Sequence, residues 1–235
     1  MNSTPNRSHT LDTETTGLRT DEGHRIIEIG VVELINGMRS GRTYHAYLNP
    51  QRDVPADAVR VHGITGDMLA DKPLFCDVVD DFLAFIGTDT LIIHNAQFDL
   101  EFVNAELAKV GRPALGNRIV DTMLLARRKF PMSPASLDAL CRRYKIDLTD
   151  RTKHGALLDA DLLAQVYLQL CGGPQATLGF ADQNVQTAPA SRGQRVPREA
   201  QPIPAADLAR HLDFLNRLGL PQWSAAPEAG PKMQG

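Results

Sequence analysis

Two carboxylates stand two residues apart near the start of the chain, in the segment Leu11-Asp12-Thr13-Glu14-Thr15-Thr16-Gly17-Leu18. In an extended strand, side chains two residues apart lie on the same face, so Asp12 and Glu14 are expected side by side. Adjacent carboxylates repel each other unless a cation lies between them, and the pair therefore indicates half of a divalent-metal site. A solvated strand end would give the same pattern, so the rest of the sequence has to decide.

A second acidic segment, His94-Asn95-Ala96-Gln97-Phe98-Asp99, follows a short apolar strand. Ligands of open α/β sheets bind at the carboxyl edge of the strands, where this segment is expected. Asp99 then lies in the first turn of a helix. A carboxylate there can also serve the helix dipole alone, and both interpretations stay open at this point.

The third segment is His154-Gly155-Ala156-Leu157-Leu158-Asp159-Ala160-Asp161. Within one helix, His154 and Asp159 would lie about 140° apart around the axis and would not converge. Gly155 predicts instead that His154 lies in the preceding loop, with Asp159 in the helix beside its buried side. Asp161 points elsewhere, and we expect it to be solvated.

These segments together supply four carboxylates and one histidine: Asp12, Glu14, Asp99, Asp159 and His154. Oxygen ligands without cysteine suit Mg²⁺ or Mn²⁺ rather than zinc. Four carboxylates can hold two metal ions about 3.5–4 Å apart, which bracket the attacking and leaving oxygens of a phosphodiester. A histidine with a near-neutral pKa can take the proton of the attacking water.

The elements that must position these residues alternate between strands and helices. Hydrophobic periodicity predicts strands at residues 26–35, 43–48, 91–94 and 119–121, with a hairpin signal at Asn36-Gly37. It predicts helices at residues 77–86, 98–110, 123–128, 137–144 and 156–170. Strands followed by strand–helix alternation indicate an α/β or mixed sheet flanked by helices.

Composition restricts the class of protein. The chain has 235 residues, 43% of them hydrophobic and 23% charged, which is typical of a soluble globular domain with an appendage. It has no apolar run of the ~20 residues that span a bilayer, and its start lacks a signal-peptide core, so we expect it in the cytoplasm. The net charge of −3 argues against gripping long duplex DNA through many phosphates. Cys76, Cys141 and Cys171 are expected as buried apolar thiols.

The composition changes after residue 171. Residues 172–204 are rich in Pro, Gln, Gly and Ala and predict a flexible linker. Residues 205–218 return to helical spacing, with Leu208, Leu212 and Leu215 on one side. An isolated helix of this length is marginal in water, so we expect it to gain stability from a partner.

The segments LDTETTGL, HNAQFD and HGALLD, in this order, resemble the DEDDh 3′→5′ exonucleases, whose fold is ribonuclease H-like. HRIIEIGVVEL, VHGIT, SLDALCRRY and RTKHGALLDADLLAQVYL are similar to the branch that proofreads for bacterial replicative DNA polymerases. The similarity covers roughly residues 11–171. It implies a mixed five-stranded sheet, metal ligation by Asp12, Glu14, Asp99 and Asp159, and His154 as general base.

The same resemblance implies contacts with substrate and partners. Asp57 and His62 fall where the family contacts the terminal nucleotide of a single-stranded DNA 3′ end, and Leu18 falls where relatives wedge the last base. Leu18 can equally be an ordinary residue packed in a turn. Gln175, Leu178 and Phe180 resemble a sliding-clamp-binding motif. Leu208, Leu212, Leu215 and Trp223 look like the anchor for the polymerase catalytic subunit.

The sequence thus predicts a disordered N-terminus at residues 1–10, an exonuclease domain at 11–171, a linker with the clamp motif at 172–204 and a polymerase-binding tail at 205–235. The expected function is removal of mispaired 3′-terminal nucleotides from DNA as nucleoside 5′-monophosphates. An exoribonuclease that trims RNA 3′ ends and a polymerase–clamp adaptor are the alternatives. One feature departs from the family, because the polar residues Arg7-Ser8-His9-Thr10 precede Leu11 where an apolar strand is usual.

Overall fold

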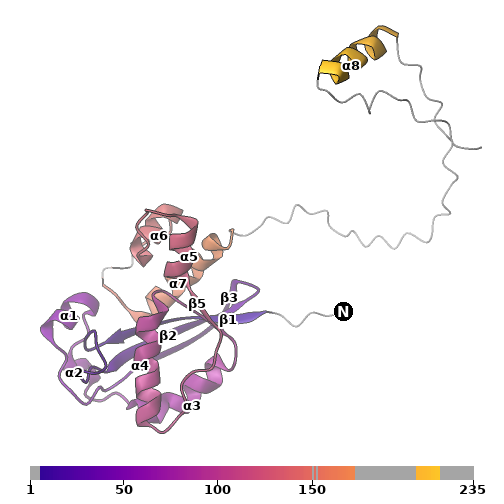
Figure 1. Ribbon diagram of the computed structural model, residues 1–235. Helices are drawn as coiled ribbons and strands as arrows, with labels where there is room; N and C mark the ends of the chain where they lie inside the picture. The colour runs from indigo at the N-terminus through magenta and orange to yellow at the C-terminus, as the bar shows by residue number, and fades with distance from the viewer. Residues whose placement is uncertain (1–5, 150, 152, 173–204, 218–235) are drawn as a thin grey trace, which may run out of the picture. The chain divides into compact units, whose positions relative to one another are not determined.

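The computed structural model describes residues 6–149, 151, 153–172 and 205–217, and the chain divides into two units, Met1–Phe180 and Ala181–Gly235. The first unit contains a five-stranded sheet with helices packed against it (Figure 1). Its strands are β1 (Arg7–Thr15), β2 (Ile26–Ile35), β3 (Met38–Tyr47), β4 (Thr90–Ile93) and β5 (Ile119–Asp121). The mixed sheet that the sequence predicted is therefore confirmed.

The strand order β3-β2-β1-β4-β5 places β1 at the centre. β1 pairs antiparallel with β2 and parallel with β4, and β4 pairs parallel with β5. The carboxyl ends of β1, β4 and β5 therefore meet at one edge of the sheet. Ligands of open α/β sheets bind at such an edge.

The helices cover both faces of this sheet. One core joins β1 and β2 to α3 (Phe75–Ile86) and α4 (Ala96–Lys109). A second core lies on the opposite face, and its helices are α5 (Thr122–Lys129), α6 (Leu137–Tyr144) and α7 (Ala156–Leu170). In Figure 1, α4 crosses the sheet while α5, α6 and α7 gather together above it.

β1 begins earlier than the sequence suggested. The expected disordered segment 1–10 is wrong for residues 7–10, because Ser8, His9 and Thr10 are buried within the strand. The Thr10 hydroxyl donates to the carbonyl of Ala160 in α7 at 2.8 Å. The His9 ring packs against the Phe85 ring, with centroids 5.3 Å apart. Thr10 thus has a hydrogen-bond acceptor on α7, and the His9 ring packs against α3, at strand positions that are usually apolar.

The β2–β3 hairpin forms at the predicted Asn36-Gly37 turn, where both residues have positive φ. β3 nevertheless starts at Met38, five residues before the expected start at Thr43. A two-residue turn lets pairing resume at once, and Ile35 pairs with Met38. Because β3 is an exposed edge strand, its first residues carry no apolar alternation that would have indicated it.

Two short helices follow β3 without a predicted counterpart, α1 (Ala56–His62) and α2 (Gly66–Leu69). Neither has a side-chain N-cap, and neither is long enough for a helical repeat of apolar residues. α1 ends at Gly63, whose φ of 79° closes the helix in the left-handed conformation.

The cysteines do not all follow the expectation of buried thiols. Cys141 is buried in the α6–α7 core, but Cys76 and Cys171 are exposed. Cys76 lies in the first turn of α3, with its Sγ 3.6 Å from Oδ1 of Asp77, and Cys171 follows the last residue of α7. Both positions lie at helix ends that face solvent.

The second unit contains α8 (Ala205–Arg217), close to the predicted helix. Leu208 and Phe214 are exposed, whereas Leu215 is buried. No described helix is long and apolar enough to cross a membrane. The predicted linker motif at Gln175, Leu178 and Phe180, and also Leu218 and Trp223, lie outside the described residues.

Candidate active site

Asp12 and Glu14 lie on the same face of β1, as the spacing predicted. Thr10, two residues earlier, bonds to α7, so alternation along the strand turns all three side chains toward that helix. Their partners across the β1–β2 ladder are Gly30 and Glu28. The acidic pair therefore faces the start of α7 rather than open solvent.

Gly30 allows α7 to approach the sheet closely. A Cβ atom at this position would lie 2.3 Å from the carbonyl carbon of Ala156 and 2.3 Å from the amide nitrogen of Leu157. The buried Glu28 holds the same helix end, because its Oε2 accepts the Ala156 N–H at 3.1 Å and its Oε1 lies 2.7 Å from Nε2 of His45. Strand β2 thus fixes the first turn of α7, which carries Asp159.

Asp99 reaches the same edge from α4. Its Oδ1 accepts the backbone N–H of Thr13 at 3.0 Å and the Thr13 hydroxyl at 2.7 Å, which ties α4 to β1 between the two acidic residues. Asn95 begins this helix with a φ of 64°. Asp121 at the end of β5 accepts the N–H of Ala96 at 3.0 Å and also caps α5.

His154 lies in the loop before α7, as predicted, and Asp159 lies within the helix. The Nδ1 atom of His154 is 3.3 Å from Oδ2 of Asp159. Arg151 binds both Asp159 oxygens, with Nε 2.5 Å from Oδ1 and Nη2 2.7 Å from Oδ2. Asp161 is turned away and pairs with Arg39 of β3, so it is a partly exposed ion-pair partner rather than a freely solvated side chain.

Burial and mutual repulsion raise the pKa of three of the four carboxylates. Burial, followed by the charges of Asp99 and Asp159, raises the pKa of Asp12 well above its usual range. Burial also raises the pKa of Glu14 to about 8 and that of Asp99 to about 7. These three carboxyl groups therefore hold their protons more tightly than free carboxyl groups do.

Asp159 behaves differently from the other three acids. Burial alone would raise its pKa, but the hydrogen bonds from Arg151 and His154 lower it below its usual value. The hydrogen bond with Asp159 raises the pKa of His154 despite its partial burial. The histidine and the carboxylate thus stabilise each other's charged forms.

The donor set fits a divalent metal ion. One ligand atom from each of Glu14, His154 and Asp159 lies within 4.8 Å of the others. Asp12 and Asp99 interact electrostatically with the same cluster. Carboxylate oxygens are the ligands that Mg²⁺ and Mn²⁺ prefer, and a bound cation would relieve the repulsion between them.

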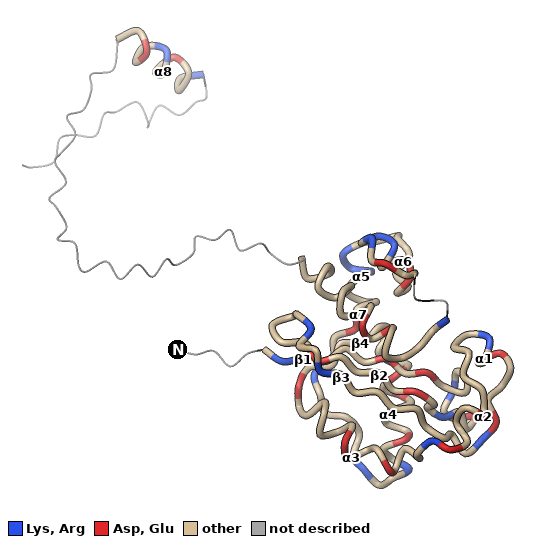
Figure 2. Tube along the Cα trace, turned by 180° about the vertical axis from the view of Figure 1, so that it is seen from behind, with Lys and Arg blue, Asp and Glu red and all other residues tan. Residues whose placement is uncertain are grey.

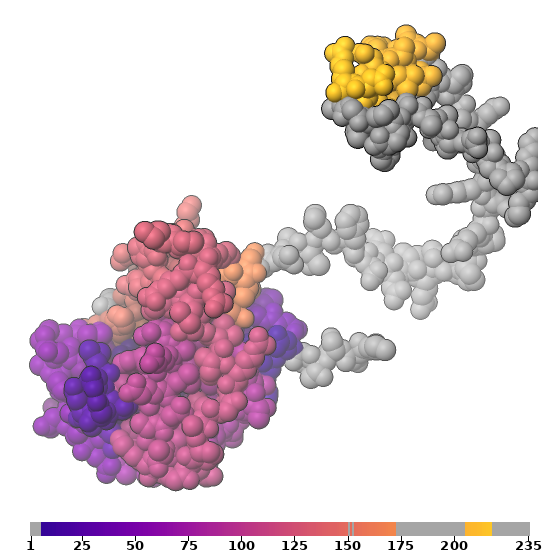
Figure 3. All heavy atoms as spheres, viewed as in Figure 1, coloured from indigo at the N-terminus to yellow at the C-terminus, as the bar shows by residue number. Residues whose placement is uncertain are grey.

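A cleft of about 610 Å³ opens beside Glu14 and is lined by Leu18, Asp57, His62 and Phe98. The structure thus brings the three predicted substrate contacts to one cleft next to the acids. Leu18 is 81% exposed, whereas His62 is buried, with its Nδ1 accepting the N–H of Ile64. In Figure 3 the indigo surface of the β1–β2 connection and the purple surface around α1 lie next to each other at this place.

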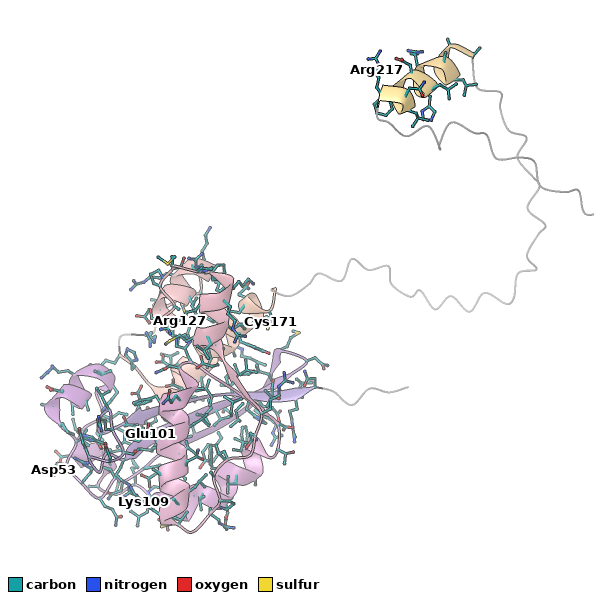
Figure 4. The ribbon with its side chains drawn as sticks, in the orientation of Figure 1. Asp53, Glu101, Lys109, Arg127, Cys171 and Arg217 are labelled. Carbon is teal, nitrogen blue, oxygen red and sulfur yellow. The ribbon has the colours of Figure 1, made fainter. Side chains whose placement is uncertain are left out.

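Contacts on α4 also hold the connection that carries Leu18. The Thr20 hydroxyl donates to Oε1 of Glu101 at 2.7 Å, and Figure 4 shows Glu101 on the exposed side of this helix. The Thr16 hydroxyl lies 3.0 Å from Nδ1 of His24, whose ring fills the space next to Gly17. Contacts with Glu101 of α4 and with the His24 ring therefore fix the turn that follows the acidic pair.

Four residues of the site were not singled out from the sequence: Thr13, Glu28, Asp121 and Arg151. Two of them had a signal, since Glu28 is a charged residue inside the apolar run IIEIGVVELI and Asp121 precedes a helix in the manner of an N-cap. No sequence signal marked Thr13 or Arg151. The partner of Thr13 is Asp99, far along the chain, and the spacing of Arg151 and Asp159 matches no strand or helix repeat.

Comparison with known proteins agrees with this geometry. Residues 10–167 match the exonuclease family. The DNA polymerase III subunit epsilon of Rickettsia felis is 45% identical over 217 residues, covering 88% of this chain and 95% of the relative. That of Salmonella typhimurium is 48% identical over 189 residues, covering 77% of each chain.

Solved structures show the same fold. Exonuclease X in complex with 5′ overhanging duplex DNA aligns with a TM-score of 0.57 and 29% identity, covering 69% of this chain and 90% of that one. A 3′-exonuclease that recognises the histone mRNA stem-loop aligns with a TM-score of 0.61 and 18% identity, covering 72% of this chain and 64% of that one, a likeness of fold alone. The chain therefore belongs to the exonuclease family, in the group that contains the DNA polymerase III epsilon subunits.

Proposed function

We propose that this chain is a metal-dependent 3′→5′ proofreading exonuclease that removes mispaired nucleotides from the 3′ end of DNA for a replicative DNA polymerase. The observation that carries the proposal is the convergence of Asp12, Glu14, Asp99, His154 and Asp159 beside one cleft. Relatives named as DNA polymerase III epsilon subunits over most of the chain support the DNA substrate.

Asp12, Glu14, Asp99 and Asp159 would hold two divalent ions, Mg²⁺ or Mn²⁺. Bound divalent ions supply Lewis-acid stabilisation for the attacking and leaving oxygens of a phosphodiester. Buried hydrogen bonds fix the positions of these ligands. Thr13 donates to Asp99, and Glu28 accepts from the first turn of the helix that carries Asp159.

His154 would act as the general base. When Nδ1 carries its proton toward Asp159, Nε2 has a free lone pair and can take the proton of the attacking water. The side chain is 48% exposed, so Nε2 can reach solvent and substrate. The products would be a nucleoside 5′-monophosphate and a strand shorter by one nucleotide.

The cleft would receive the terminal nucleotide. Leu18 projects into solvent at its rim, where it can wedge against the last base, and Asp57 and His62 would contact the nucleotide from α1. No base-specific contact is needed for proofreading, because a mismatched end unpairs at a lower cost in free energy than a matched one.

The tail would connect the nuclease to its partners. Gln175, Leu178 and Phe180 would bind the sliding clamp, and Leu208, Leu212, Leu215 and Trp223 would bind the polymerase catalytic subunit. The exposed Leu208 on the amphipathic helix α8 supports the second contact.

The test compares substrates under identical conditions with Mg²⁺. We expect a DNA primer with a 3′ mismatch to be degraded faster than a matched primer and faster than single-stranded RNA of the same sequence. An Asp12→Asn variant should lose this activity, whereas Asp161→Asn, a matched change of an acid away from the site, should retain it. Preference for RNA would contradict the proposal and would favour an RNA-trimming exonuclease.

A further inference from the structure

Arg151 lies where a cation is needed. Its guanidinium covers both oxygens of Asp159, with Nε and Nη2 at 2.5 and 2.7 Å, and its Nη1 pairs with Asp138 of α6. The Arg151 side chain is only 7% exposed. Among the described residues, Asp159 is the one predicted metal ligand with an ion pair to lysine or arginine. Asp12, Glu14 and Asp99 have none there.

We propose that Arg151 is a positioning residue that serves as the internal counterion of Asp159 in the metal-free site and yields this carboxylate when metal binds. Asp138 is the second anchor, which retains the guanidinium after it leaves Asp159. The inference rests on the proposed function, since it takes Asp159 as a metal ligand.

Electrostatics supports an exchange between the two cations. A guanidinium and a metal ion bound to the same carboxylate repel each other across a few ångströms, and the buried setting screens this repulsion poorly. Asp159 can therefore satisfy either cation better alone than both together. Asp138 is 42% exposed and remains available to Arg151, so the displaced guanidinium need not lose its partner.

The contact between Arg151 and His154 also supports the displacement of Arg151 when metal binds. Nη2 of Arg151 lies 3.1 Å from Nδ1 of His154, and Oδ2 of Asp159 lies 3.3 Å from the same nitrogen. Nδ1 can accept from the guanidinium or donate to the carboxylate, but one tautomer cannot do both. Accepting from Arg151 places the ring proton of neutral His154 on Nε2, the atom that must be unprotonated in a base. Departure of Arg151 frees Nδ1 to donate to Asp159.

The test measures Mn²⁺ binding to the full chain without DNA, by the electron paramagnetic resonance signal of the free ion at one fixed pH. In Arg151→Gln the metal no longer displaces a guanidinium, and we expect the dissociation constant to fall about tenfold. In Asp138→Asn the guanidinium keeps only Asp159, and we expect the dissociation constant to rise. A merely structural role of Arg151 predicts weaker binding in Arg151→Gln.

Arg25→Gln is the matched control. Arg25 forms another bidentate pair with a buried carboxylate, Glu106, at 2.5 and 2.7 Å, away from the metal cluster. It should lower the free energy of unfolding without changing Mn²⁺ affinity. Unchanged or weaker binding in folded Arg151→Gln, or unchanged binding in Asp138→Asn, overturns the inference. Absence of Mn²⁺ binding by the wild type would instead contradict the proposed metal-dependent function.

Discussion

At the scale of single residues, His154 is well suited to a clean deletion experiment. Its side chain is 48% exposed and sits in a loop, so His154→Ala removes the proposed base without leaving a cavity in the core. We expect turnover of mismatched DNA to fall about 10²–10⁴-fold, the usual contribution of a general base. The thermal midpoint should stay close to that of the wild type.

The control for His154→Ala is His211→Ala, which changes an exposed histidine of α8 outside the nuclease unit. This variant should retain full turnover. Wild-type turnover in a folded His154→Ala variant would remove His154 from the proposed mechanism.

Glu14 and Asp99 predict an unusual pH dependence for the metal-free protein. Folding raises the pKa of Glu14 from 4.5 to about 8 and that of Asp99 from 3.8 to about 7, and burial of the side chain is the largest cause in both. A carboxyl whose folded pKa is raised binds its proton more tightly in the folded state. Its stabilising contribution is complete below the unfolded pKa and is lost as the pH rises through the folded value.

We therefore expect the contribution of these two carboxyls to the free energy of unfolding, measured with urea in the presence of EDTA, to fall as the pH rises from about 4.5 to about 8. Burial lowers the pKa of His9, His62 and His94, which acts in the opposite direction, so the comparison of variants isolates the acids. Saturating Mn²⁺ should oppose this loss, because the metal replaces the protons. Glu14→Gln should reduce the slope, whereas a change of the exposed Glu22 to Gln should leave it as in the wild type. The same pH slope in EDTA for the wild type and for Glu14→Gln would contradict the raised pKa of Glu14.

At the scale of elements, the site depends on the close approach of α7 to β2. Gly30→Ala would place its Cβ 2.3–2.4 Å from backbone atoms of Ala156 and Leu157, so the helix has to move. We expect a loss of about 1–3 kcal/mol in unfolding free energy, the usual cost of overpacking. Turnover should fall as well, because the shift displaces Asp159.

Gly116→Ala is the matched change, since nothing lies within 4 Å of a Cβ there and its φ is not in the left-handed range. Urea unfolding and turnover of both variants check the prediction. Equal stability and equal turnover in Gly30→Ala and Gly116→Ala would show that α7 does not need this contact.

The elements that the sequence predicted well are those with a clear period. β2, β5, α6 and α7 have the predicted bounds, because their apolar residues repeat at strand or helix spacing and their ends carry turn or cap residues. The start of β1 was missed since His9 and Thr10 are polar. Their partners, Phe85 and the Ala160 carbonyl, come from helices far along the chain.

The same limit applies to the site. Asp12, Glu14, Asp99 and Asp159 can be predicted as metal ligands because residue type, strand alternation and helix position each leave a trace in the sequence. The proposed role of Arg151 leaves no trace in the sequence, because it depends on where α6 and α7 place Asp138 and Asp159. Tertiary packing alone creates that pair of neighbours.

At the scale of the whole molecule, the net charge conceals a local pattern. Figure 2 shows basic residues gathered on α5 and α6, although the chain has a net charge of −3. The exposed cations there are Arg127, Arg128, Lys129, Arg142 and Arg143. The net charge of −3 therefore does not exclude a local contact between this basic surface and nucleic acid.

Division of the chain into two units predicts that catalysis and polymerase binding can be separated. All five residues of the proposed chemistry lie in Met1–Phe180, whereas α8 lies in Ala181–Gly235. Deletion of residues 201–235 should abolish co-elution with the purified polymerase catalytic subunit and leave turnover of a free mismatched primer unchanged. A full-length Phe180→Ala variant is the control, and it should bind polymerase but lose the proposed clamp contact. Retained polymerase binding after the deletion would show that the contact lies in the nuclease unit, and loss of turnover would show that the two units act together in catalysis.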